Sequence, residues 1–176
     1  MVGWSPHRFT FPTANYERPD IMSFVVTSPA PDQTEAEIAS NAFFPSVPPA
    51  NIRASHRIDN TVTAERLRDV LIESIASVNQ ELHIWRINQE TAGKATLAAV
   101  EANEVDGVSI NVHRYLRAVG CMAKALLIER YADFDATGKH AKTEAQMEDP
   151  IDDLRRDARW AISDIIGIGR TTVELI

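Results

Sequence analysis

The chain has 176 residues, a formal net charge of −7 and a pI near 5.2. This acidic balance argues against a protein that grips nucleic acid, because such a protein neutralises phosphates with a basic face. The single cysteine, Cys121, excludes an intramolecular disulfide framework, and its apolar helical surroundings are typical of an inert core thiol. No apolar run approaches the ~18 residues of a membrane span. Polar residues and prolines near the N-terminus occupy the positions where a signal peptide has its apolar segment. We therefore expect a protein that is made in the cytosol, with no membrane partner.

Residues 1–42 are predicted to form an extended N-terminal arm. Eight of the nine prolines lie in the first 50 residues, and proline interrupts both helices and sheet ladders. The arm is nevertheless too rich in aromatic residues for a plain disordered linker. These are Trp4, Phe9, Phe11, Tyr16 and Phe24. Two interpretations stay open, an arm that lies along a neighbouring subunit and a mobile tail.

Residues 43–176 are predicted to form an all-α domain, a bundle of three main helices. Phe43 and Phe44 are expected to plug onto its core. The first helix is expected over residues 64–91, capped by Thr63 and closed by Gly93. An Asp106-Gly107 turn precedes a second helix over about residues 110–131. The predicted buried stripe of the first helix is Leu67, Val70, Leu71, Ser74, Ile75, Val78, Leu82 and Trp85, and that of the second is Val112, Tyr115, Leu116, Val119, Met122 and Leu126.

The third helix is expected to be capped by Asp149, to have Pro150 at its first position and to end at Gly167. The segment 167–176 that follows resembles a strand, because β-branched and apolar residues alternate up to the last residue. Such an ending is typical of a docking element rather than of a frayed terminus. The docking candidates in it are Arg170, Thr171, Val173, Leu175 and Ile176.

The third helix also carries segregated charges beside its apolar stripe. Arginines lie on one flank, aspartates on the other, and Trp160 lies between them. One interpretation is an ordinary solvated face. The other is a head-to-tail contact between subunits, which closes into a ring. The interface candidates are Arg155, Arg159, Trp160, Asp153, Asp157 and Asp164.

The sequence offers no catalytic constellation, so we expect neither an enzyme nor a cofactor. The five histidines lack zinc-ligand spacing, and neither a phosphate-binding glycine loop nor a nucleophile elbow is present. The segment from Asp133 to Glu144 matches the ligand spacing of an EF-hand calcium loop. His140 and Ala141 depart from that pattern and no second loop exists to pair with it, so a solvated connection is the favoured interpretation and no metal is expected.

An ordered series of segments resembles the head completion proteins of contractile-tailed temperate phages, which connect portal and tail. The matching segments are FFP at 43–45, VTAERLRDVLIESIASVNQEL at 62–82, Val105-Asp106-Gly107 with Ser109, RAV at 117–119, ERYADFDAT at 129–137 and DLRRDARWAI at 153–162. No single segment is a sharp motif, but their order and spacing extend from about residue 41 to the C-terminus.

The resemblance implies a structural virion protein at the head–tail neck. It would assemble as a dodecameric ring on the portal protein after DNA packaging, stabilise the filled head and present a surface to a tail terminator or other neck protein. Packaged DNA would pass by without sequence-specific binding. The resemblance further suggests the terminal segment from Arg170 to Ile176 as the part that reaches the portal. The alternatives are a cellular all-α homo-oligomeric interaction module and a helical DNA-binding regulator.

Overall fold

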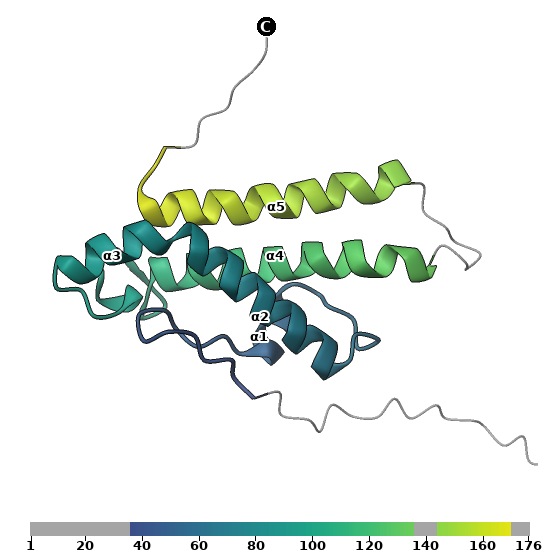
Figure 1. The fold of residues 1–176 in the computed structure, drawn as a ribbon, viewed down its shortest axis with the longest axis horizontal. Coiled ribbons are helices and arrows are strands. Elements are labelled where there is room, and N and C mark those ends of the chain that lie inside the picture. Colours follow the sequence, from purple (N-terminus) through teal and green to yellow (C-terminus); the bar gives the residue numbers. More distant parts are fainter. Residues whose placement is uncertain (1–35, 136–143, 170–176) are drawn as a thin grey trace, which may run out of the picture. The chain divides into compact units, whose positions relative to one another are not determined.

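The computed structural model describes residues 36–135 and 144–169, and within these ranges the chain is mostly helical. The expectation of a helical fold is thereby confirmed. The predicted tail residues 170–176, most of the predicted arm and the middle of the calcium-like segment lie outside the described residues. The helices are α1 (Pro49–Ser55), α2 (Ala64–Glu81), α3 (His83–Thr91), the short 3-10 helix η1 (Leu97–Ala99), α4 (Ile110–Asp135) and α5 (Glu144–Ile166), and the strands are β1 (Glu104–Val105) and β2 (Val108–Ser109) (Figure 1). No helix within the described ranges is long and apolar enough to cross a membrane.

Helix α4 is the central element of the helical domain. It runs antiparallel to α5, and α2 crosses it (Figure 1). Because two helices cover it, α4 buries small residues as well as its predicted stripe. Tyr115 and Val119 of that stripe are buried, whereas the other four members are only half-buried. The additional buried hydrophobic residues of α4 are Ala118, Cys121, Ala123, Ala125 and Leu127.

Three predicted helix ends are confirmed by their backbone geometry. The Thr63 hydroxyl accepts a hydrogen bond from the Arg66 amide at 3.4 Å and caps α2. Gly93 and Gly167 both have φ of +82°, the left-handed conformation that ends a helix after α3 and α5. After α5, the Ile168 amide donates to the Ser163 carbonyl at 3.0 Å, which satisfies one of the last free carbonyls.

The predicted first helix is interrupted, which corrects the expectation of one continuous helix over residues 64–91. The break lies at Leu82, where ψ is 0°. Neither proline nor glycine marks the position, so local sequence does not reveal it. The bend places the Leu82 side chain fully inside the core, and α3 continues in a new direction. The predicted stripe of α2 from Leu67 to Val78 is buried as expected.

The start of the last helix is also corrected. Helix α5 begins at Glu144, so Asp149 is not its N-cap and Pro150 lies inside the helix. Upstream of the proline the sequence Glu144-Ala145-Gln146-Met147-Glu148 consists of strong helix formers. A proline removes one backbone hydrogen bond, and these residues extend the helix past that loss.

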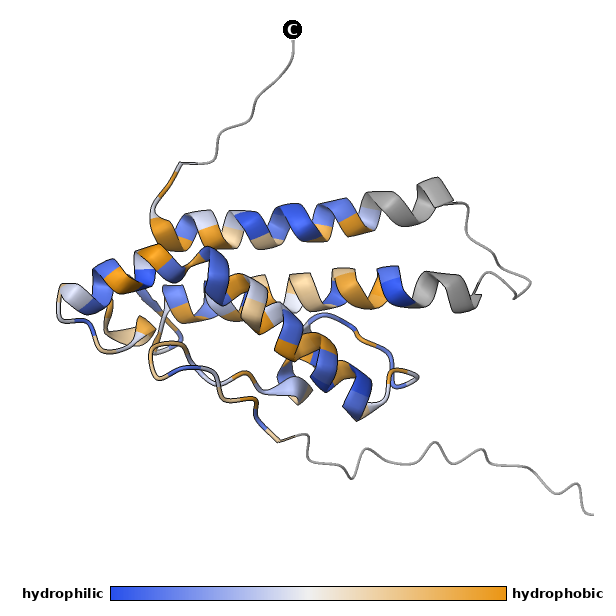
Figure 2. Ribbon diagram, viewed as in Figure 1, coloured by the Kyte–Doolittle hydropathy of each residue, from blue (hydrophilic) through white to orange (hydrophobic). Residues whose placement is uncertain are grey.

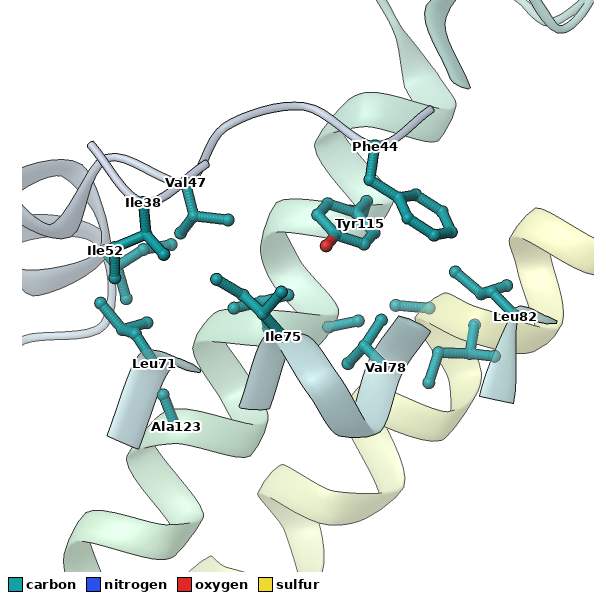
Figure 3. Packing of buried hydrophobic residues seen from close by; sticks show 14 of the residues in the cluster. Ile38, Phe44, Val47, Ile52, Leu71, Ile75, Val78, Leu82, Tyr115 and Ala123 are labelled. Atoms are coloured by element: carbon teal, nitrogen blue, oxygen red, sulfur yellow. The ribbon is translucent and has the colours of Figure 1, made fainter. Parts of the chain in front are cut away.

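The segment from Ile38 to Val47 packs on the helices and contributes to the core. Ile38, which the sequence places in the arm, is buried and exchanges two backbone hydrogen bonds of 2.9 Å with Val47. The predicted packing of Phe43 and Phe44 on the helical core is confirmed, since both side chains are buried. The Phe44 ring stacks on Tyr115 of α4 with centroids 4.8 Å apart and an interplanar angle of 6° (Figure 3).

A polar chain fixes this segment to two helices. The Tyr115 hydroxyl donates to Asn79 Oδ1 at 2.8 Å, and Asn79 Nδ2 donates to the Ser40 hydroxyl at 2.7 Å. Burial raises the pKa of Tyr115 to about 12, so the hydroxyl stays a donor at neutral pH. These two hydrogen bonds tie residue 40 to both α2 and α4.

Candidate functional site

The predicted interface residues of α5 divide into two groups by their contacts. The first group lies along the seam with α4. Arg155 pairs with Glu129 at 2.5 Å, and Asp157 pairs with Arg117 at 3.0 Å. Asp164 accepts a hydrogen bond at its carbonyl from Arg114 at 3.1 Å.

These pairings follow from the position of the charged flanks. A residue beside the apolar stripe of a helix lies at the edge of the face that packs on its neighbour. The sequence shows which α5 residues flank the stripe. It does not show which charged residues of α4 pair with them, because that depends on how the two helices align. Three of the six predicted interface residues are therefore engaged by α4.

The second group faces away from α4. Arg156 pairs with Asp153 at 2.7 Å and lies over the Trp160 ring at 4.9 Å from its centroid. Trp160 is half-buried and Arg159 is exposed. A tryptophan flanked by a stacked arginine is a typical interface anchor, since both residue types are enriched where binding energy concentrates.

A β-hairpin and a groove lie at the N-terminal end of α4. Asp106 and Gly107 have φ of +55° and +69° and join β1 to β2, which confirms the predicted turn. The groove beside this hairpin has a volume of about 560 Å³. It is lined by residues of α3, the hairpin segment, the start of α4 and the end of α5, among them Trp85, Val105, Ile110, Asn111, Arg114 and Ile165.

Five exposed large apolar side chains lie on α3, on the hairpin and just after α5, and of these Val105 lines the groove. Ile84 and Ile87 lie on α3, Val105 and Val108 form the cross-strand pair of the hairpin, and Ile168 follows α5. Figure 2 shows the apolar positions of α3 and of the end of α5 in orange. We call the hairpin β1–β2, together with the groove beside it, the hairpin end. Sequence reasoning missed it, although Val105 and Val108 flanking an Asp-Gly turn are the signal for an exposed hairpin.

A histidine and a cysteine meet between α1 and α4. His56 Nε2 lies 3.9 Å from Cys121 Sγ, and Lys124 Nζ donates to the His56 carbonyl at 2.7 Å. Burial lowers the pKa of His56, and the charges of Lys124 and Arg117 act in the same direction. Burial also raises the pKa of the Cys121 thiol, with the Asp157 carboxylate adding to the effect. A nucleophilic cysteine needs a lowered pKa, and the pKa of Cys121 is shifted in the opposite direction.

No group of three metal-ligating side chains occurs in the parts of the chain that the structure describes. The described surfaces are suited to binding other macromolecules through apolar and charged contacts. Fold and surfaces together describe a helical protein whose outer face of α5 and hairpin end combine apolar and charged side chains.

The comparisons with known proteins give the family. The family model described as phage head completion protein (GPL) matches residues 38–176, and the chain belongs to this family. A relative from Escherichia phage P2, named head completion/stabilization protein, is 40% identical over 151 residues. That alignment covers 86% of this chain and 89% of the relative. No solved structure matches the chain. The resemblance read from the ordered segments is thereby confirmed, and the protein is a phage head completion protein, a component of the virion.

Proposed function

We propose that the protein is the adaptor between portal and tail, assembling as a dodecameric ring on the portal protein after DNA packaging. The observation that carries the proposal is the P2 relative, which is named for head completion and stabilisation and aligns with 86% of the chain. In this role the ring stabilises the filled head and presents the surface to which a tail terminator or other neck protein attaches. The net charge of −7 supports a ring through which packaged DNA passes without being held.

The contact between subunits is proposed to centre on the outer face of α5. Trp160, Arg159 and the Arg156–Asp153 pair point away from α4 and supply an anchor with charges of both signs. The contacts of Arg155, Asp157 and Asp164 with α4 hold α5 in place and so fix the orientation of its outer face. Exposed ion pairs contribute little at physiological salt, so the free subunits associate weakly and need the portal as a template.

The C-terminal segment is proposed to reach the portal through Arg170, Thr171, Val173, Leu175 and Ile176. Support comes from the sequence alternation, which gives apolar anchors on one side of an extended strand. Support also comes from the described end of the domain, where Gly167 ends α5 and the exposed Ile168 leads into the segment.

Deleting residues 171–176 tests this role. The truncated protein should keep its helical circular dichroism spectrum and its free energy of unfolding within about 1 kcal/mol, as for an exposed terminus. Its binding to purified portal rings should fall sharply, and heads assembled with it should lose DNA. A truncated protein that unfolds would place the segment in its own core. One that folds, binds the portal and retains DNA would contradict the docking role.

A further inference from the structure

The hairpin presents a pair of exposed valines in a fixed position. Val105 and Val108 lie directly opposite each other in the β1–β2 pair, so their side chains point to the same face of the hairpin. They are 54% and 39% exposed. The hairpin is held on α4, because the Ile110 amide donates to the Asn103 carbonyl at 2.9 Å and His113 Nε2 lies 3.1 Å from the Val105 carbonyl oxygen. Exposed apolar residues are common on protein surfaces, so the charges around the pair have to identify the partner.

The charges around the valine pair are all negative. Residues 100–109 contain Glu101, Glu104 and Asp106 and neither lysine nor arginine. All three acidic residues are exposed, and none of them forms an ion pair within the described residues. Carboxylates beside an exposed apolar pair are complementary to a partner surface with basic side chains around an apolar group.

The outer face of α5 is such a surface. From Arg156 to the end of the helix, the exposed charged residues are Arg156 and Arg159, whereas Asp157 and Asp164 are half-buried and contact α4. The exposed aspartates of the helix precede this stretch. Arg156 lies over the ring of the half-buried Trp160, and Arg159 forms no ion pair in the parts of the chain that the structure describes. An aromatic side chain flanked by two arginines matches the apolar and acidic hairpin.

The two surfaces lie on different sides of the subunit. Ala158, Ala161 and Ile162 are buried on the side of α5 that packs on α4, so the two arginines face away from α4. The hairpin instead leads into the N-terminus of α4. Their complementarity is therefore available to a second copy of the chain. A contact between two different surfaces of identical subunits is head-to-tail, and it closes into a ring when the rotation between subunits permits.

We propose that the hairpin end of one subunit binds the outer face of α5 of the next subunit. Glu101 and Glu104 then face Arg156 and Arg159, and the valine pair packs beside Trp160. This inference rests on the proposed function for the ring itself, and it names the surface that meets α5, which the ring alone leaves open. The partner is a second copy of this chain.

The test uses full-length variants with reversed charges, and circular dichroism checks that each one folds. The hairpin variant carries Glu101→Lys and Glu104→Lys, and the α5 variant carries Arg156→Glu and Arg159→Glu. A combined variant carries all four changes and has the net charge of the wild type. Asp106 is left unchanged because its φ is +55° in the turn. The measured quantity is the protein concentration at which half of the purified portal rings carry a ring of this protein, determined by native mass spectrometry.

The hairpin variant and the α5 variant should each need at least about tenfold more protein, because like charges then face each other across the contact. The combined variant should return to within about threefold of the wild type, because opposite charges face each other again. The matched control combines the α5 variant with Asp69→Lys and Glu73→Lys on the exposed side of α2. It has the same net charge as the combined variant and should stay as weak as the α5 variant.

The outcomes separate this inference from the proposed function. If the wild type binds the portal and the hairpin variant forms rings equally well, the hairpin end is not the partner of α5. The inference is also overturned if the combined variant stays as weak as the two single-surface variants, or if the α2 control recovers as well. If the wild type does not bind the portal, the proposed function fails. Light scattering of the free proteins at high concentration then decides the inference: the same pattern of loss and recovery in self-association supports it, and any other pattern overturns it.

Discussion

The imidazole of His56 occupies the space where a side chain on Gly120 would begin. A Cβ atom added at Gly120 would overlap with three atoms of the ring, so α1 can approach α4 this closely only because residue 120 is glycine. The short helix α1 contributes the buried Pro49 and Ile52 to the core, and this approach fixes its last residues on the central helix.

Gly120→Ala should therefore destabilise the protein by about 1–3 kcal/mol, the range for overpacking. Urea unfolding monitored by circular dichroism measures the change. The double variant Gly120→Ala with His56→Ala should lose less than the sum of the two single variants, because removing the ring removes the overlap. Additive losses would show that the two residues do not interact.

The stability should depend on pH through His56. Its pKa is lowered in the folded protein, chiefly by burial, so the unfolded chain binds the proton more readily. The stabilising contribution is complete above the unfolded pKa of about 6.5 and is lost as the pH falls below it. Urea titrations between about pH 7.5 and 5.5 should show a smaller loss for His56→Gln than for the wild type. An identical loss in both proteins would contradict this role.

Cys121 should react slowly with thiol reagents in the folded protein. The side chain is buried, and burial together with the nearby Asp157 raises its pKa, so little thiolate is present near neutral pH. Absorbance with a chromogenic disulfide should show slow labelling in buffer and rapid labelling of one thiol per chain in denaturant. Rapid labelling without denaturant would mean that the contact between α1 and α4 opens readily.

Reversing the charge of Arg159 should weaken ring formation without unfolding the subunit. Arg159 is exposed on the outer face of α5, beside Trp160. Arg159→Glu should keep the wild-type circular dichroism spectrum but form fewer rings on portal in electron micrographs. Arg68→Glu changes an exposed arginine of α2 and is the matched control. This variant loses a hydrogen bond to the Ala36 carbonyl, but it should form rings as the wild type does. Equal assembly of both variants would remove α5 from the subunit contact.

The helices and their ends could be predicted from the sequence wherever the determinant is local. The Thr63 cap, the closing residues Gly93 and Gly167 and the Asp106-Gly107 turn depend on one or two residues each. The bend at Leu82 depends instead on burial of that side chain in the finished core, and no local residue marks it. Pro150 misled the prediction because a proline that usually opens a helix lies inside one here.

The candidate site was predictable only in part for a similar reason. Helical spacing identifies which α5 residues flank the apolar stripe, and Trp160 does lie away from it. The partners of the flanking charges, such as Arg117 for Asp157, are forty residues away in the sequence and are set by how α4 and α5 align. The hairpin end combines four separate elements, and only the folded chain brings them together.

The central claim is that this protein forms a ring on the portal. Mixing the purified full-length protein with purified portal rings and determining the mass of the complex by native mass spectrometry tests it most directly. The account predicts one dodecamer of this protein on each portal ring, with free protein remaining monomeric or weakly associated. A portal ring that carries no copies, or a scattered number of copies without a ring, would contradict it.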